Sequence, residues 1–296
     1  MKTKTIHPFL LVSALAILSA SAQPSADADL RKLEASAAKG DAAAQFDLGR
    51  DYFRGEGGVV RDDRQAAEWF RKSAEQDFGK AQHNLGYMYS VGRGVKADGA
   101  EAAKWYLKAA EQGIDRSQYA LAELLANGTG VDRNSTEAAK WYRKAAEQGF
   151  PPAEIRLGAL YYFGAEDFKK NYQEAAVWLG RAAERGNAFA QNALGAIYGL
   201  GLAGKRDVAK AVEWYQKAAW QGDAKAESNL GRMYSEGEGV EMDPAKAYAW
   251  LTLSARQGEV TAQNCLDGFA KGLTPKQVAE GERLAKEYAA RIRPGR

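Results

Sequence analysis

The 296-residue sequence contains one cysteine, two histidines and seven prolines, and its charges nearly balance. The single cysteine, Cys265, cannot form a disulfide within the chain or a thiolate metal cluster. Two histidines, His7 and His83, leave little with which to build a histidine-rich metal site or a Ser-His-Asp triad. The 41 Lys and Arg against 38 Asp and Glu give a formal net charge of +3, so no basic domain points to nucleic acid.

Long hydrophobic runs are also absent, apart from one near the N-terminus. Lys2 and Lys4 precede an apolar run over residues 9–18, and Ala20-Ser21-Ala22 then supplies the small residues that signal peptidase requires. An apolar run of about ten residues is too short to span roughly 30 Å of hydrocarbon as a helix. We therefore expect residues 1–22 to be a signal peptide cleaved after Ala22, which would make the mature protein periplasmic or secreted, without a membrane span. The alternative is an uncleaved N-terminal anchor.

The sequence is rich in repetition. Six tryptophans recur at intervals of 36 or 37 residues, at Trp69, Trp105, Trp141, Trp178, Trp214 and Trp250. A leucine column runs beside them, each leucine followed by Gly or Ala, at Leu48, Leu85, Leu121, Leu157, Leu194 and Leu230. Self-similarity with a period in this range predicts a solenoid.

Each repeat predicts two helices. The first carries A-x-x-x-L-G-x-x-Y, as at Ala81, Leu85, Gly86 and Tyr89, a spacing that places one apolar stripe on a helix. The second carries A-x-x-W-Y-x-K-A-A, with apolar residues again three and four apart. Because a glycine such as Gly86 costs a helix about 1 kcal/mol relative to alanine, we expect a neighbouring helix to approach it too closely for a Cβ atom.

The ends of the helices are marked as well. A G-x-G-V turn follows the first helix in three repeats, and glycine suits the left-handed residue that ends a helix. Each second helix follows an Asp or Asn, the residues that best accept the unpaired N–H groups of a helix start. This predicted N-cap column comprises Asp62, Asp98, Asn134, Asn171, Asp207 and Asp243. Thr274-Pro275-Lys276-Gln277 predicts a capping box that opens a last helix ending near Arg291.

The series A-x-x-x-L-G-x-x-Y, G-x-G-V-x-x-D and A-x-x-W-Y-x-K-A-A-x-x-G resembles the Sel1-like repeat, a relative of the tetratricopeptide repeat, over roughly residues 42–270. The resemblance implies an all-α fold, a right-handed α/α superhelical solenoid used as a protein-interaction scaffold, with no shared catalytic residues. Many exported relatives staple each helix pair with a disulfide, which this chain cannot do. The fourth repeat departs from the pattern with Gly164-Ala165-Glu166-Asp167, and Asp77 replaces a glycine that ends the other second helices.

We expect the mature chain to be organised as follows. Residues 23–41 form an N-terminal capping helix, and residues 42–259 form six repeats, at about 42–78, 79–114, 115–150, 151–187, 188–223 and 224–259. Residues 260–292 form a C-terminal half-repeat and capping helix, and residues 293–296 form a frayed tail.

The first helices leave one face opposite the leucine column, at positions two before, two after and five after each leucine. In tetratricopeptide-like solenoids this face lines the concave groove, and aromatic and arginine side chains are common anchors of binding surfaces. We predict that this face binds a segment of a protein partner through Phe46, Arg50, Phe53, His83, Tyr87, Tyr119, Glu123, Ile155 and Tyr162. The alternative is that these aromatics only fill contacts between neighbouring first helices.

Together these patterns favour an exported, non-catalytic scaffold or adaptor whose partners are proteins, envelope proteins in particular, with no catalytic residue, metal or cofactor and no nucleic acid. A secreted host-facing factor of the same family and a cell-wall or β-lactam hydrolase are the alternatives. The hydrolase hypothesis rests on Ser36-Ala37-Ala38-Lys39, an S-x-x-K match that lacks S-D-N and K-T-G partners. We expect Cys265 to be a small, partly buried residue, and the alternative is an intermolecular disulfide.

Overall fold

The computed structural model describes residues 23–292, and in that range the chain consists of helices and loops with no β-strand. Its one β-type contact is an isolated bridge between Ala165 and Phe168 in a loop. The predicted signal peptide, residues 1–22, and the predicted frayed tail, residues 293–296, lie outside the described residues.

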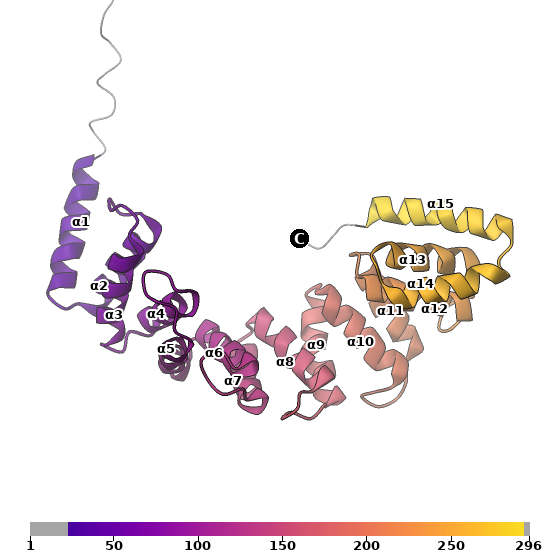
Figure 1. Ribbon diagram of the computed structural model, residues 1–296, viewed down its shortest axis with the longest axis horizontal. Helices are drawn as coiled ribbons and strands as arrows, with labels where there is room; N and C mark the ends of the chain where they lie inside the picture. The colour runs from indigo at the N-terminus through magenta and orange to yellow at the C-terminus, as the bar shows by residue number, and fades with distance from the viewer. Residues whose placement is uncertain (1–22, 293–296) are drawn as a thin grey trace, which may run out of the picture. The chain divides into compact units, whose positions relative to one another are not determined.

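The helices follow one another as hairpins, one for each repeat, after an N-terminal helix, α1 (Gln23–Ala38) (Figure 1). The first helices of the six repeats are α2 (Ala42–Arg54), α4 (Gly79–Val91), α6 (Asp115–Asn127), α8 (Pro151–Phe163), α10 (Ala188–Leu200) and α12 (Ala224–Glu236). The second helices are α3 (Asp63–Ala74), α5 (Gly99–Glu111), α7 (Ser135–Glu147), α9 (Tyr172–Glu184), α11 (Val208–Ala219) and α13 (Pro244–Arg256). They are followed by α14 (Val260–Phe269), the short 3-10 helix η1 (Ala270–Gly272) and α15 (Pro275–Arg291).

The chain divides into two compact units, Met1–Ile114 and Asp115–Arg296. The first unit holds α1 and two repeats, and the second holds four repeats with α14 and α15. Within each unit, every first helix packs against the second helix of its own repeat, and each second helix packs against the first helix that follows. Nearest-neighbour packing of this kind is the solenoid arrangement, so the all-α solenoid class predicted from the sequence is confirmed.

The leucine column forms the core of the hairpins. Its members are at most 4% exposed, at Leu48, Leu85, Leu121, Leu157, Leu194 and Leu230. The tryptophan column is less uniform, because Trp69 and Trp214 are only half-buried. Lys72 and Lys217 each place Nζ 3.9 Å from the ring centre of these tryptophans, and their aliphatic stems cover apolar surface while the ammonium groups stay in water.

In five repeats a glycine follows the leucine and lies close to side chains of the paired second helix; the third repeat has Ala122 there. A Cβ atom added at Gly86 would lie 2.8 Å from Cδ1 of Tyr106, and one added at Gly158 would lie 2.7 Å from Cγ of Leu179. Contacts this short leave no room for a methyl group. The expectation that a neighbouring helix excludes a Cβ atom at Gly86 is confirmed.

The predicted N-cap column is confirmed in all six repeats. Each of these side chains accepts a hydrogen bond from a backbone N–H two or three residues later, at 2.8 to 3.1 Å. At the opposite ends, Gly92 closes α4 with φ +70°, in the left-handed region where glycine is unstrained. Asp77 adopts φ +58° after α3, and among the described residues it is the one non-glycine residue with positive φ.

The departing loop of the fourth repeat makes its own contact with the preceding repeat. The Asp167 carboxylate accepts hydrogen bonds from the backbone N–H groups of Ser135, at 2.6 Å, and Thr136, at 3.3 Å, where α7 begins. A helix N-terminus favours negative charge, and the hydrogen bonds from Ser135 lower the pKa of Asp167. The loop of the second repeat makes an equivalent connection by an ion pair between Arg93 and Asp63 at 2.8 Å. Loops that differ in sequence therefore both attach to the preceding second helix.

The last helix covers the final full repeat. Thr274 accepts a hydrogen bond from the Gln277 N–H and donates its own N–H to the Gln277 side chain, so the predicted capping box is confirmed. α15 packs against α13, where the ring centre of Tyr288 lies 4.7 Å from that of Trp250 and 5.1 Å from that of Trp220. This contact shields the aromatic surface that a further repeat would otherwise have to cover.

Candidate protein-binding site

Three consecutive first helices of the second unit border an open hollow of about 510 Å³. We call it the first-helix hollow, and its lining is Tyr119 of α6, Pro152, Ile155, Arg156, Ala159 and Phe163 of α8, and Phe189 of α10. Six of these seven side chains are apolar or aromatic, and Phe163 is 56% exposed. Clustered apolar surface that remains open to solvent is typical of interaction sites.

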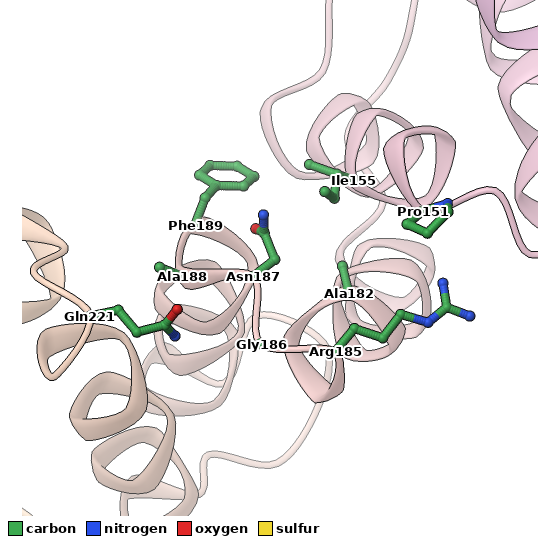
Figure 2. A pocket seen from close by; sticks show the side chains of 9 residues that line it. All are labelled: Pro151, Ile155, Ala182, Arg185, Gly186, Asn187, Ala188, Phe189 and Gln221. Carbon is green, nitrogen blue, oxygen red and sulfur yellow. The ribbon is translucent and has the colours of Figure 1, made fainter. Parts of the chain in front are cut away.

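A second hollow, of about 460 Å³, adjoins the first and shares Ile155 and Phe189 with it. We call it the junction hollow, and the rest of its lining is Pro151, Ala182, Arg185, Gly186, Asn187, Ala188 and Gln221. Figure 2 shows Ile155 and Phe189 apart on different helices, with Asn187 beside Phe189. The junction hollow therefore continues the apolar lining of the first-helix hollow into a more polar stretch.

The one charged side chain in the lining of the first-helix hollow is neutralised by a neighbour. Arg156 Nε lies 3.1 Å from Oε1 of Glu123, and a second guanidinium nitrogen lies 3.2 Å from Oε2. A hydrogen bond with Tyr119, together with the charge of Glu123, raises the pKa of Arg156. Glu123 also accepts a hydrogen bond from the Tyr142 hydroxyl, and burial together with this bond raises the pKa of Tyr142. Because the cation is paired, the hollow presents a mainly apolar surface.

The four predicted groove residues of the second unit have different surroundings. Tyr119 and Ile155 both line the first-helix hollow. Glu123 lies in a smaller hollow of about 220 Å³, which it borders together with Arg156. Tyr162 packs against Tyr172, with ring centres 5.7 Å apart, and is not part of the lining of the first-helix hollow. The structure therefore brings two of the four predicted residues directly to the hollow.

Two of the five predicted groove residues in the first unit pack among aromatic neighbours. The ring centre of Phe46 lies 5.8 Å from that of Phe70 and 5.2 Å from that of Phe78. Phe53 lies 6.3 Å from the ring of Tyr87, itself a predicted groove residue that is 40% exposed. Phe46 and Phe53 thus contribute to packing between helices, while Tyr87 keeps part of its ring in solvent.

The other two predicted residues of the first unit are polar. Arg50 forms an ion pair with Asp47, one helical turn earlier, at 2.8 Å. His83 packs against Tyr106, with ring centres 5.6 Å apart. His83 therefore contacts the second helix of its own repeat, whereas Arg50 pairs along its own helix.

Five residues of this lining are not among the predicted groove residues: Arg156, Ala159, Pro152, Phe163 and Phe189, the last three of which supply most of its apolar surface beyond Tyr119 and Ile155. Counted from the leucine of its own helix, Phe163 is six positions later, and Pro152 and Phe189 are five positions earlier. Pro152 and Phe189 lie one helical turn before the position two before the leucine, and residues three or four apart share a helix face. Extending the stripe by one turn toward the N-terminus would have found these two, whereas Phe163 is the residue directly after Tyr162, four positions after Ala159.

The remaining predicted features give no second site. Ser36 of the S-x-x-K match donates a hydrogen bond to Asp41 at 3.4 Å, and Lys39 is exposed. Cys265 on α14 is half-buried. Across residues 23–292, no three His, Cys, Asp or Glu side chains gather in a way that could hold a metal ion. None of the helices in this range combines the length and apolar character needed to cross a bilayer.

Comparisons with known proteins identify the family to which the chain belongs. The model of the Sel1 repeat matches the chain six times, at residues 42–78, 79–114, 115–150, 151–187, 188–223 and 224–259. Among solved structures, a Sel1 repeat protein from Oxalobacter formigenes is 34% identical with a TM-score of 0.62, and the match covers 83% of this chain and 96% of that chain. A protective antigen present in uropathogenic Escherichia coli strains, which displays an SLR fold, is 30% identical with a TM-score of 0.41, covering 90% of this chain and 72% of that chain. The search of curated proteins finds no match. The chain belongs to the Sel1 repeat family.

Proposed function

We propose that this protein is a non-catalytic scaffold that binds a segment of another protein in the first-helix hollow. Solenoids of Sel1 repeats are typical of protein-interaction scaffolds. The observation that carries the proposal is the open apolar hollow of about 510 Å³ formed by three successive first helices.

The extent of the hollow favours an extended or helical chain segment over a compact small molecule. The first-helix hollow shares Ile155 and Phe189 with the junction hollow, and Arg156, Ala159 and Phe163 with the smaller hollow. Three hollows with shared walls offer successive positions for side chains that project from one backbone. Helix-in-groove recognition uses this kind of spaced apolar anchor.

The lining defines the chemistry of the segment. Phe163 and Phe189 offer aromatic surface, and the guanidinium of Arg156 is already paired with Glu123. An acidic segment would gain little from a neutralised cation, whereas an apolar or aromatic side chain would remove exposed aromatic surface from water at about 25 cal/mol per Å². We therefore propose a partner segment anchored by Leu, Met, Phe or Trp side chains.

The predicted groove residues enter this proposal in two groups. Tyr119 and Ile155 contact the segment directly, while Glu123 holds Arg156 in place and Tyr162 supports the surrounding aromatic packing. In the first unit, Phe46, Arg50, Phe53, His83 and Tyr87 stay a prediction of a further contact stretch, of which Tyr87 is the most exposed aromatic member.

We also propose that the chain is exported, with cleavage after Ala22, to the periplasm or the outside of the cell, and that its partners are envelope proteins. The support is the charged start, apolar run and small residues of residues 1–22. A host-facing role would be the alternative for a secreted form. Mass spectrometry of the protein purified from the exported fraction should give a chain that begins at Gln23, and a chain that retains residues 1–22 would contradict the proposed cleavage.

Selection from a peptide display library tests the binding proposal. Peptides of about 15 residues panned against the purified protein should be enriched in apolar and aromatic anchors. Phe163→Asp should weaken the binding of a selected peptide at least about tenfold, because a charge then faces the apolar anchor. Leu200→Asp is the matched control, since Leu200 is 63% exposed on α10 and does not line the first-helix hollow.

Two results would reject the proposal. One is a selected peptide that binds the Phe163→Asp variant as tightly as the unmodified protein. The other is the failure of any peptide to be enriched. Covalent labelling of the purified protein by a fluorescent penicillin would separately contradict its assignment as non-catalytic.

A further inference from the structure

A column of buried glutamines joins the two helices of four repeats. In four repeats, the amide Nε2 of a glutamine after the second helix donates to the side-chain oxygen of a buried glutamine on the first helix. These pairs are Gln76 with Gln45 at 2.7 Å, Gln112 with Gln82 at 2.8 Å, Gln148 with Gln118 at 2.8 Å, and Gln221 with Gln191 at 2.7 Å. The buried glutamine therefore acts as an acceptor toward its own repeat.

The same buried glutamines act as donors toward the preceding second helix or, in the first repeat, toward α1. The Nε2 atom of Gln45, Gln82 and Gln191 donates to a backbone carbonyl eight positions earlier, at the end of the preceding helix, at 3.1, 3.2 and 3.0 Å. The column thus needs a group that both accepts and donates. A neutral amide satisfies this requirement, whereas a carboxylate can only accept.

Two repeats carry glutamate at this position, and the two glutamates differ in their partners. Glu154 and Glu227 are 1% and 0% exposed, and Oε1 of each is buried without a hydrogen-bond partner. Oε2 of Glu154 pairs with Arg185, a cation that replaces the usual glutamine after the second helix. Oε2 of Glu227 instead accepts a hydrogen bond from the neutral amide of Gln257 at 2.8 Å.

The charged groups around Glu227 do not compensate a negative charge. On its own helix, the Asp223 carboxylate caps α12 by accepting from the Ala226 N–H at 2.8 Å, and its charge acts unfavourably on an ionised Glu227. Burial raises the pKa of Asp223, the charge of Lys225 at the start of α12 opposes this shift, and the charge of Glu259 just before α14 adds to it. None of the described basic side chains forms an ion pair with Glu227. By the register of the column, the carbonyl that its side chain should meet belongs to Ala219, the last residue of α11.

We propose that Glu227 is held as the neutral acid, whose proton replaces the glutamine hydrogen toward the end of α11, and that loss of this proton loosens the junction between the fifth and sixth repeats. A neutral carboxylic acid donates through one oxygen and accepts through the other, as the amide does. An ionised Glu227 would place a buried charge beside a carbonyl terminus that already carries partial negative charge. The column is thereby complete only when the proton is present.

The direction of the pH effect follows from the burial of the group. Burial raises the pKa of Glu227 to about 7, the Asp223 charge acts in the same direction, and the hydrogen bond from Gln257 opposes it. A pKa that is higher in the folded than in the unfolded chain means that stability is greatest below the unfolded value and is lost as the pH rises through the folded value. The unfolding equilibrium constant should therefore increase at least about tenfold between about pH 5 and about pH 8.

Urea unfolding of the full chain at these two pH values, with Glu227→Gln and the matched control Glu154→Gln, tests the proposal. The Glu227→Gln variant should lose most of the increase in the unfolding equilibrium constant with pH. It should also be more stable than the unmodified protein at the higher pH, because an amide needs no proton to complete the column. Burial also raises the pKa of Glu154, although the Arg185 charge opposes this shift. Glu154→Gln retains Glu227 and should therefore lose less of the increase than Glu227→Gln. An increase that persists unchanged in Glu227→Gln would overturn the proposal.

A direct titration keeps the proposal testable even if a variant fails to fold. The carboxyl carbons of ¹³C-labelled glutamate in the unmodified protein should include one that titrates with a midpoint near 7. That resonance should persist in Glu154→Gln and be missing from Glu227→Gln. If no glutamate titrates above about pH 6, the inference is wrong.

Discussion

Two glycines of the fourth repeat have opposite surroundings. Gly158 faces the paired helix, where an added Cβ atom would lie 2.7 Å from Cγ of Leu179 and 3.0 Å from its backbone nitrogen. Gly180, on that paired helix, has no heavy atom within 4 Å of an added Cβ atom. Packing thus requires glycine at position 158, whereas no packing contact requires it at position 180.

Alanine at these two positions should change stability in opposite directions. Gly158→Ala should lower the free energy of unfolding by about 1–3 kcal/mol, because the methyl group forces α8 and α9 apart. Gly180→Ala should raise it by about 0.5–1 kcal/mol, because alanine loses less conformational entropy in a helix. Urea unfolding followed by circular dichroism measures both effects, and changes of the same sign would contradict the assigned packing.

Sequence patterns predicted the residues whose partners are local or strictly periodic. The leucine column, Gly86 and the N-cap column follow from helix periodicity and capping chemistry, which act over a few residues. The glutamine column was missed because each side chain meets partners about 30 residues later and eight residues earlier. Its signal was a Gln or Glu that recurs after a buried small residue in every first helix, after alanine in five of them, as Gln82 follows Ala81, and after Ser117 in α6.

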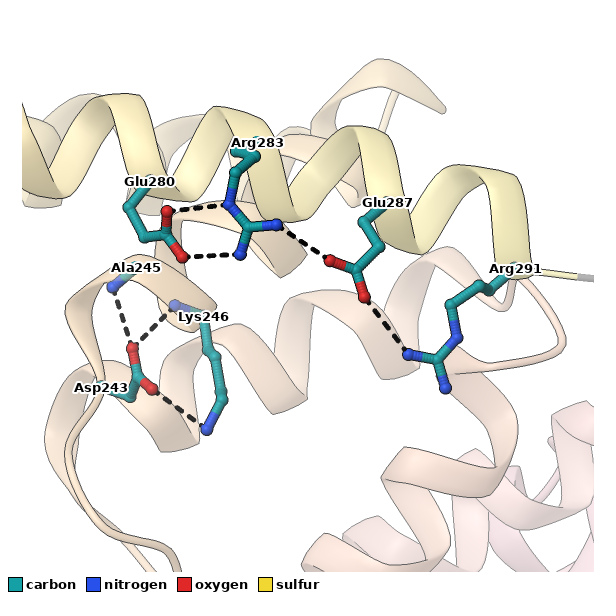
Figure 3. Close-up of polar contacts among 7 residues, drawn as sticks. All are labelled: Asp243, Ala245, Lys246, Glu280, Arg283, Glu287 and Arg291. Atoms are coloured by element: carbon teal, nitrogen blue, oxygen red, sulfur yellow. Dashed lines mark hydrogen bonds and ion pairs between the residues drawn. The ribbon is translucent and has the colours of Figure 1, made fainter.

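At the scale of elements, α13 and α15 show two kinds of polar contact side by side (Figure 3). The Asp243 carboxylate accepts hydrogen bonds from the backbone N–H groups of Ala245 and Lys246, at 3.1 and 3.0 Å. On α15, Arg283 forms ion pairs with Glu280 at 2.7 Å and Glu287 at 3.2 Å. The first contact satisfies helix N–H groups, while the second joins side chains that solvent already surrounds.

The N-cap should matter more to stability than the ion pairs. Asp243→Ala should cost about 1 kcal/mol, because the first N–H groups of α13 lose their acceptor, and Asp243→Asn should retain most of that stability. Arg283→Ala should change stability by less than about 1 kcal/mol, because the side chain of Arg283 is 59% exposed. Thermal melts of the three variants would refute this ranking if the Arg283 variant proved the least stable.

Helix starts could be predicted from the sequence more fully than helix docking. The capping box at Thr274 gives the start of α15, because capping needs only four consecutive residues. That α15 packs against α13 depends on Tyr288 meeting Trp250 of α13, a residue far earlier in the chain. No local sequence pattern indicates such a partner, so the packing of α15 over α13 could not be predicted from the sequence.

At the scale of the whole molecule, the repeat determines the fold and its irregularities create the candidate site. Tyr119 and Ile155 were predicted from the periodic face, because the leucine column fixes which side of each first helix points away from the core. Phe163 and Phe189 complete the first-helix hollow at positions where other repeats carry other residue types, such as Arg54 and Lys80. A hollow depends on the combined shape of side chains from three helices, which periodicity alone does not give.

Amide hydrogen exchange of the full chain, with and without a peptide selected on it, tests the central claim most directly. Binding in the first-helix hollow should slow exchange in α6, α8 and the first turn of α10, and should leave α12 to α15 unchanged. Slowed exchange confined to α12–α15 or to residues 23–114 would contradict the proposed site.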